Sequence, residues 1–270
     1  MTGSVVLDRG QSVSNDGNES GELVERRRHG RVLVISMRRA AKRNAIDRAM
    51  ADALDEALNE LDDDDDLWAG ILTGTADVFS AGSDLRARGD YVTRRGGEYG
   101  IIRRVRRKPL VAAVEGPALG GGLEIALTCD LVVAATTARF GLPEVSIGVV
   151  PTCAGLFRGP HALPLNVARQ LILTGRPIDA ARAHQLGFVN VLAEPGEALA
   201  EAERLAQEIC DNAPVSVQSC LAAVNTLAAH DDALGWEQTE AALAAASSSV
   251  DAREGVAAFL EKRPPVWTGH

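Results

Sequence analysis

The repeated order of a short apolar run, a turn rich in small residues and a helical segment most constrains how this chain can fold. Residues 68–73, 110–115 and 131–135 are mainly apolar and of strand length, and turns at 77–85 and 116–122 follow the first two of them. Short apolar runs bounded by turn residues are typical of buried strands, and strands that alternate with helices are typical of α/β folds. The sequence therefore predicts an α/β core of repeated ββα units.

Further elements are predicted around these units. Two strands are expected over 23–25 and 31–37, an amphipathic helix over 47–61 and a basic helix over 97–107. From residue 163 onward the sequence is rich in alanine and helical in pattern. Helices are predicted there over 167–174, 179–186, 197–212, 215–230 and 233–249.

The chain divides into three parts. Residues 1–21 are rich in Ser, Asn, Gly and Asp, which is typical of a flexible arm. Residues 22–200 form the predicted α/β core, and residues 201–270 form a helical C-terminal region. A chain of 270 residues can bury about three quarters of its unfolded surface, so the core is large enough to hold a buried active site.

The charge of the chain restricts its partners. The chain has 28 Lys and Arg against 37 Asp and Glu, and the net charge of −9 argues against general nucleic-acid binding. Two basic clusters, within 26–43 and 94–108, are compatible with a small polyanionic ligand, with solvated faces or with subunit contacts. The five aspartates at 62–66 are expected in a solvated loop.

The cysteines and the apolar runs indicate the compartment. The 4 cysteines form no CxxC pair and have no histidine at zinc-ligand spacing, so no metal site is expected. Unpaired cysteines are typical of a reducing cytoplasm. There is no apolar run of membrane-spanning length and no signal-peptide core, so neither a membrane location nor export is expected.

The segment PALGGGLEIALTCD at 117–130 is the first candidate for chemistry. Glycines that lead into a helix expose backbone N–H groups where the helix dipole favours negative charge. The segment lacks the Lys-Ser or Lys-Thr of a phosphate-binding P-loop, and no GxGxxG follows the first strand. Two interpretations remain, an oxyanion hole or a helix that packs closely through glycine.

Two glutamates in apolar surroundings are candidates for acid and base. Glu124 follows the glycine run, and Glu144 stands in ARFGLPEVSIGVVP. Burying a carboxylate costs several kcal/mol unless a partner compensates, and two such groups side by side would titrate as a pair. A cap or an arginine partner is the alternative for Glu124. A glycosidase could use such a pair, but only 4% of the chain is aromatic.

The turn FSAGSDL at 79–85 could supply a second N–H donor from a separate loop. Its serines do not stand in a GxSxG elbow, and no nearby histidine could activate them, so the sequence disfavours a serine hydrolase.

Five segments in register resemble the enoyl-CoA hydratase/isomerase, or crotonase, superfamily, and most closely its enoyl-CoA hydratases. They are FSAGSDL, GPALGGGLEIALTCD, ARFGLPEVSIGVVP, LILTGRPIDAARAHQLGFVNVL and EGVAAFLEKRPPVW, and the match extends from about 23 to 267. The resemblance implies a ββα superhelix with a C-terminal helical trimerisation region, assembled as a homotrimer or dimer of trimers. It also implies an acyl-CoA thioester substrate.

The resemblance assigns roles to individual residues. It implies an oxyanion hole from the backbone N–H groups of Ser83 and Gly121, and a catalytic pair of Glu124 and Glu144 that adds water across a 2-enoyl-CoA to give a 3-hydroxyacyl-CoA. Glu144 would deliver the proton to C2, and no metal or redox cofactor is implied. The implied contacts to CoA are Lys42, Arg43, Ala81, Asp84, Leu85, Phe259 and Lys262, the last two from a neighbouring subunit.

One departure leaves the acyl group open. Close hydratases often have PGAGG after the second glutamate, whereas this chain has PTCAG at 151–155. The alternatives are a carnitinyl-CoA dehydratase-like enzyme, an isomerase or hydrolase acting on CoA esters, and a CoA-ester-binding protein without catalysis. A purely structural oligomer would leave both glutamates buried without benefit.

Overall fold

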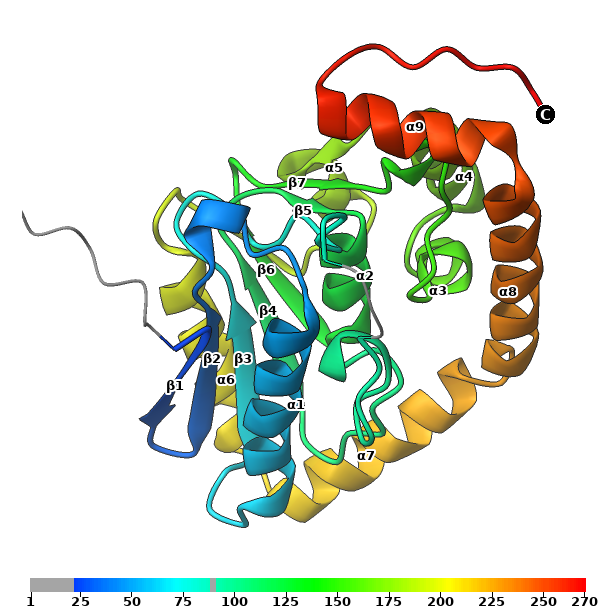
Figure 1. Cartoon of the computed structure of the whole chain (residues 1–270). Coiled ribbons are helices and arrows are strands. Elements are labelled where there is room, and N and C mark those ends of the chain that lie inside the picture. Colours follow the sequence, from blue (N-terminus) through cyan, green and yellow to red (C-terminus); the bar gives the residue numbers. More distant parts are fainter. Residues whose placement is uncertain (1–21, 88–90) are drawn as a thin grey trace, which may run out of the picture.

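A six-stranded sheet forms the centre of the molecule, with strand order β1-β2-β3-β4-β6-β9 (Figure 1). The structure is a computed structural model that describes residues 22–87 and 91–270, so the flexible arm expected at 1–21 lies outside the described residues. β1 pairs antiparallel with β2, and the other neighbours pair in parallel. The strands are β1 (Val24–His29), β2 (Val32–Met37), β3 (Ala69–Thr73), β4 (Leu110–Val114), β6 (Leu131–Ala135) and β9 (Val191–Ala193).

Helices cover both faces of this sheet (Figure 1). α6 (Ala198–Cys210) packs on one face with Val111 and Ala113, whereas Leu110, Ala112 and Val114 of the same strand point into the larger cluster with α1 (Arg48–Asp63) and α2 (Gly121–Thr128). Strands buried on both faces are apolar throughout, which explains the continuous apolar runs. The remaining helices are α3 (Gly155–Ala162), α4 (Leu165–Thr174), α5 (Ala180–Gln185), α7 (Pro214–Ala228), α8 (Asp232–Ser248) and α9 (Val250–Glu261), and the remaining strands are β5 (Ala118–Leu119), β7 (Arg139–Gly141) and β8 (Ile178–Asp179).

The predicted ββα core is confirmed. The strands over 31–37, 68–73, 110–115 and 131–135 all form, and the first strand extends to His29 rather than ending at residue 25. Short 3-10 turns complete the chain, at η1 (Ala40–Lys42), η2 (Glu98–Gly100) and η3 (Glu144–Ile147).

The basic helix predicted over 97–107 is wrong. Only η2 forms there, and the residues after it are buried at every second position, at Arg104, Arg106 and Lys108. This period of two is typical of extended chain rather than of a helix. Each buried cation has its own partner. For example, Lys108 Nζ donates a hydrogen bond to the carbonyl of Leu61 in the last turn of α1, at 2.8 Å.

The aspartate run at 62–66 is not wholly a solvated loop. α1 continues to Asp63, and Asp62 is only 6% exposed, with its carboxylate 3.1 Å from the guanidinium of Arg104. The same guanidinium also contacts Asp55 and Asn59 of α1. The connection before β4 is therefore held to α1 by a buried ionic cluster.

Six arginines of the first basic cluster, those between residues 26 and 39, form ion pairs. Their partners are carboxylates of neighbouring elements: Arg26 with Glu22 and Glu60, Arg27 with Glu203, Arg28 with Glu60 and Asp64, Arg31 with Asp66, Arg38 with Glu25, and Arg39 with Asp47 and Asp84. These arginines neutralise acidic residues rather than forming a free polyanion site.

The C-terminal helices extend away from the core and return over it (Figure 1). α7 has no buried residue, whereas α8 contacts α3, and α9 packs on η3. α3 was not predicted, because its sequence contains Pro160 and two glycines. In the part of the chain that the structure describes, no helix is both long and apolar enough to cross a membrane.

Replacing Arg104 by methionine should destabilise the fold strongly. The substitution leaves Asp62 and Asp55 without their buried cation, and breaking a buried pair costs about 3–5 kcal/mol. Urea unfolding at fixed protein concentration would measure this loss. Arg204→Met is the matched control, because it breaks an exposed pair with Glu201, and such pairs contribute about 1 kcal/mol or less. Equal losses in both variants would contradict the assignment.

Candidate functional site

Glu124 lies in the first turn of α2 and is 2% exposed. Its Oε1 accepts hydrogen bonds from the backbone N–H groups of Cys153, at 2.7 Å, and Gly155, at 2.8 Å. Burial raises the pKa of this carboxyl to about 7, although the two N–H donors act in the opposite direction. No arginine forms an ion pair with Glu124 among the described residues, so the alternative of an arginine partner is wrong.

Glu144 lies on η3, beside the glycine run. A Cβ placed on Gly120 would lie 3.1 Å from Glu144 Oε1, so the carboxylate reaches the start of α2. Its Oε2 is buried and has no hydrogen-bond partner among the described residues. Burial, and then the charge of Glu124, raises the pKa of Glu144 to about 8. The two glutamates therefore interact electrostatically, as predicted for a pair.

Two backbone N–H groups lie where two turns touch. Gly82 has φ +84, and a Cβ on it would lie 2.6 Å from the nitrogen of Gly121, so a side chain cannot fit there. The N–H groups of Ser83 and Gly121 donate no hydrogen bond within 22–87 and 91–270. Two free donors on adjoining turns at a helix N-terminus form the kind of site that stabilises an oxyanion.

Asn44 holds the first of these turns in place. Its side-chain amide donates to the carbonyls of Val78, at 3.2 Å, and Phe79, at 3.0 Å, and its own carbonyl accepts from the Ser80 hydroxyl at 2.8 Å. Asn44 is fully buried with φ 51, a conformation that asparagine tolerates. No local pattern predicts this role, because the partners are more than thirty residues away in the chain.

The structure brings some of the expected CoA contacts to this turn. The N–H of Ala81 donates to the carbonyl of Arg43 at 3.0 Å, and both Lys42 and Arg43 are exposed and form no ion pair with a described residue. Leu85 is half-buried beyond the turn. The Asp84 carboxylate is already bound to Arg39, at 2.9 Å, so it is less free for a ligand than the sequence suggested.

Phe259 and Lys262 lie near the end of α9, and both are exposed. α9 itself packs directly on the turn that carries Glu144, since a Cβ on Gly255 would lie 2.3 Å from the carbonyl oxygen of Ile147. Contact of these two residues with CoA on a neighbouring subunit stays a prediction.

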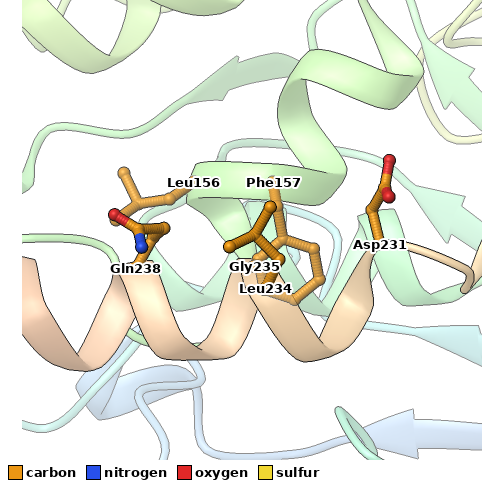
Figure 2. Close-up of a pocket in the computed structure, with 6 residues that line it drawn as sticks. All are labelled: Leu156, Phe157, Asp231, Leu234, Gly235 and Gln238. Carbon is orange, nitrogen blue, oxygen red and sulfur yellow. The ribbon is translucent and has the colours of Figure 1, made fainter.

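A separate hollow of about 300 Å³ lies between α3 and α8 (Figure 2). It contains neither glutamate, although it starts at Leu156, next to the residue whose N–H binds Glu124. The ring of Phe157 packs against the backbone of Gly235 and edge-on against Trp236, with 5.3 Å between the ring centroids, and so holds α8 against α3. The lining residues are Leu156, Phe157, Asp231, Leu234, Gly235 and Gln238.

Comparisons with known proteins show the family of this chain. Residues 27–270 match the family model described as enoyl-CoA hydratase/isomerase. A short-chain-enoyl-CoA hydratase of Clostridium acetobutylicum is 36% identical over 246 residues, which cover 87% of this chain and 94% of that protein. A putative enoyl-CoA hydratase of Thermus thermophilus is 39% identical over 250 residues, 87% of this chain and 97% of that protein.

Solved structures show the same relationship. The structure of a carnitinyl-CoA dehydratase from Mycobacterium avium is 40% identical and superposes with a TM-score of 0.87, covering 93% of this chain and 100% of that one. The fold is therefore that of the crotonases, as the motifs implied. The chain belongs to the enoyl-CoA hydratase/isomerase family.

Proposed function

We propose that the protein is an enoyl-CoA hydratase, a lyase that adds water across the 2,3 double bond of a 2-enoyl-CoA to give a 3-hydroxyacyl-CoA. One observation carries the proposal: two buried carboxyl groups, whose pKa values burial raises, lie beside the two turns that carry the free N–H groups of Ser83 and Gly121. An idle binding protein would bury Glu144 Oε2 without a partner and gain nothing for that cost.

The oxyanion hole stabilises charge on the thioester. As water adds at C3, negative charge develops on the thioester carbonyl oxygen. The N–H groups of Ser83 and Gly121 would donate hydrogen bonds to this oxygen. Each fixed donor contributes about 3 kcal/mol in comparable sites, because it is oriented before the reaction begins. The helix dipole of α2 acts in the same direction at Gly121.

The glutamates divide the proton transfers. Glu124, with a pKa of about 7, is the base that takes a proton from water, and Glu144, with a pKa of about 8, is the acid that delivers a proton to C2. Because each charge disfavours the other, the pair carries a single proton over the interval between the two pKa values. The scheme uses only protein groups and water, so no metal or redox cofactor is expected.

A second candidate function is the dehydration of a polar acyl-CoA. Relatives named carnitinyl-CoA dehydratase, such as that of Salmonella arizonae at 36% identity over 254 residues, match the chain as well as several hydratases do. The loop 151–155 supports this candidate, because it departs from the glycine-rich loop of close hydratases and supplies both N–H donors to Glu124. The same acid and base would act in the reverse direction.

The setting of the enzyme is also part of the proposal. We expect a homotrimer or dimer of trimers assembled through α7 to α9, since Val215 and Leu227 of α7 are each 75% exposed. Lys42, Arg43, Ala81, Asp84 and Leu85 are proposed to contact CoA, with Phe259 and Lys262 contributed by a neighbouring subunit. The free cysteines fit a reducing cytoplasm.

Purified protein mixed with crotonyl-CoA should remove the absorbance of the conjugated enoyl thioester, with the 3-hydroxyacyl-CoA identified by mass. Longer 2-enoyl-CoAs, and carnitinyl-CoA followed in the opposite direction, would rank the acyl groups in one series. Binding of CoA esters without turnover of any of them would leave a binding protein instead.

Glu124→Gln and Glu144→Gln should each lower kcat by about a hundredfold or more, the scale of general acid–base groups. Glu115→Gln is the matched control. The Glu115 carboxylate also accepts hydrogen bonds from two backbone N–H groups, those of Gly196 at 2.9 Å and Ala198 at 2.7 Å, but it lies at the start of α6, away from the site. The control should keep the wild-type kcat. A wild-type rate in either site variant would remove that residue from the mechanism.

The pH profile of kcat/KM should be bell-shaped. Activity should rise as Glu124 loses its proton, near pH 7, and fall as Glu144 loses its proton, near pH 8, because only the singly protonated pair has both a base and an acid. Initial rates with crotonyl-CoA from pH 5.5 to 9.5 would measure both limbs. A flat profile across this range contradicts the assignment of acid and base.

A further inference from the structure

We propose that Tyr99 is a positioning residue that fixes both halves of the oxyanion hole and the loop that binds Glu124. The inference rests on the proposed function and adds a residue to its machinery. It starts from a strained backbone: Tyr99 lies in η2 with φ 56 and ψ 11, although it is an aromatic residue. Such strain persists only where the surrounding structure imposes it.

The phenol hydroxyl reaches the first half of the oxyanion hole. Tyr99 is 2% exposed, and its hydroxyl lies 2.5 Å from the Ser83 hydroxyl. The backbone N–H of Ser83 is the first donor of the proposed oxyanion hole. The hydrogen bond to Tyr99 fixes the Ser83 side chain and so helps to orient this N–H toward the substrate. The Tyr99 end of this bond is buried, and Ser83 is half-buried.

The same hydroxyl touches the second half. A Cβ on Gly121 would lie 2.6 Å from the Tyr99 hydroxyl oxygen and 2.7 Å from ring atom Cε2. The phenol therefore rests directly on the backbone that carries the second donor. One side chain thus contacts both residues whose N–H groups form the hole, and it sets the spacing between their turns.

The loop that binds Glu124 forms the third contact. The thiol of Cys153 lies beside the phenol, and burial, followed by the charges of Cys153 and Glu124, holds the pKa of Tyr99 well above its usual value. The backbone N–H of Cys153 donates to Glu124 Oε1 at 2.7 Å. A shift of Tyr99 would therefore disturb the base as well as the oxyanion hole.

Tyr91, the other tyrosine of the chain, extends the same support. Its ring packs against Tyr99, with 6.2 Å between the centroids, and its hydroxyl donates to the carbonyls of Asp84, at 3.1 Å, and Ala87, at 2.9 Å. Both tyrosines thus bind consecutive parts of the turn that starts at Ser83.

The test is Tyr99→Phe, which keeps the ring and removes the hydroxyl. Because small displacements of positioned groups cost up to a hundredfold in rate, we expect kcat for crotonyl-CoA to fall about tenfold or more while KM changes little, the pattern of an interaction made in the transition state. Thr73→Val is the matched control, since it removes a buried hydroxyl that donates to the Ala113 carbonyl at 2.9 Å within the sheet. This variant should keep the wild-type kcat.

A spectroscopic readout separates positioning from general destabilisation. Crotonyl-CoA labelled with ¹³C at the thioester carbonyl, bound in a Glu144→Gln background where turnover is slow, should show a carbonyl stretch lowered by the oxyanion hole. Adding Tyr99→Phe should move this stretch back toward its frequency in solution, and adding Thr73→Val should not. Wild-type kcat together with an unchanged stretch in Tyr99→Phe would overturn the inference while the hydratase function stands.

A double-mutant cycle tests the route through Ser83. Ser83→Ala keeps the backbone donor and removes the other partner of the hydrogen bond, so the double variant should be no slower than the slower single variant. Rate losses that simply multiply would overturn the coupling. A wild-type chain that neither turns over crotonyl-CoA nor lowers its carbonyl stretch would instead reject the proposed function, and this inference would fall with it.

Discussion

Two backbones touch at the centre of this molecule, where the turn at Gly82 meets the first residue of α2, and the rest of the site depends on that contact. A side chain at Gly82 would collide with the nitrogen of Gly121. A side chain at Gly121 would collide with Tyr99. The turns that follow β3 and β4 can therefore bring the N–H groups of Ser83 and Gly121 close together. The sheet holds these connections in register, since β3 and β4 pair in parallel.

Several destabilising features gather around this contact. Glu144 Oε2 is buried without a partner, both glutamates resist ionisation, and Asn44, Tyr99 and Ala154 all have positive φ. Each feature costs free energy of folding, whereas the strands of the central sheet are regular and are buried between the two apolar clusters on its faces. Conflicts between local preference and global fold that collect at one place are typical of functional sites.

The parts of this architecture that follow from local pattern could be predicted from the sequence. Apolar runs predicted the strands. The two glycine-containing turns and the two glutamates indicated the donors and the acid–base pair that we propose. The predictions that were wrong or missing concern residues whose structure depends on contacts distant in sequence. The segment predicted as a basic helix over 97–107 is mostly extended, because Arg104 and the following Lys108 reach back to α1. Asn44 and Tyr99 carry no motif, and only the folded chain shows that they support the turn.

The contact between α9 and η3 has a consequence for how the protein becomes active during synthesis. The turn that carries Glu144 packs against Gly255 and Asp251, which leave the ribosome long after the whole sheet and both glutamates. A nascent chain can form the central sheet and both donor turns while one wall around its acid is still missing. Until α9 docks, the turn that carries Glu144 lacks the helix that packs on Ile147 and Gly148. The sheet can therefore form before the surroundings of the proposed acid are complete.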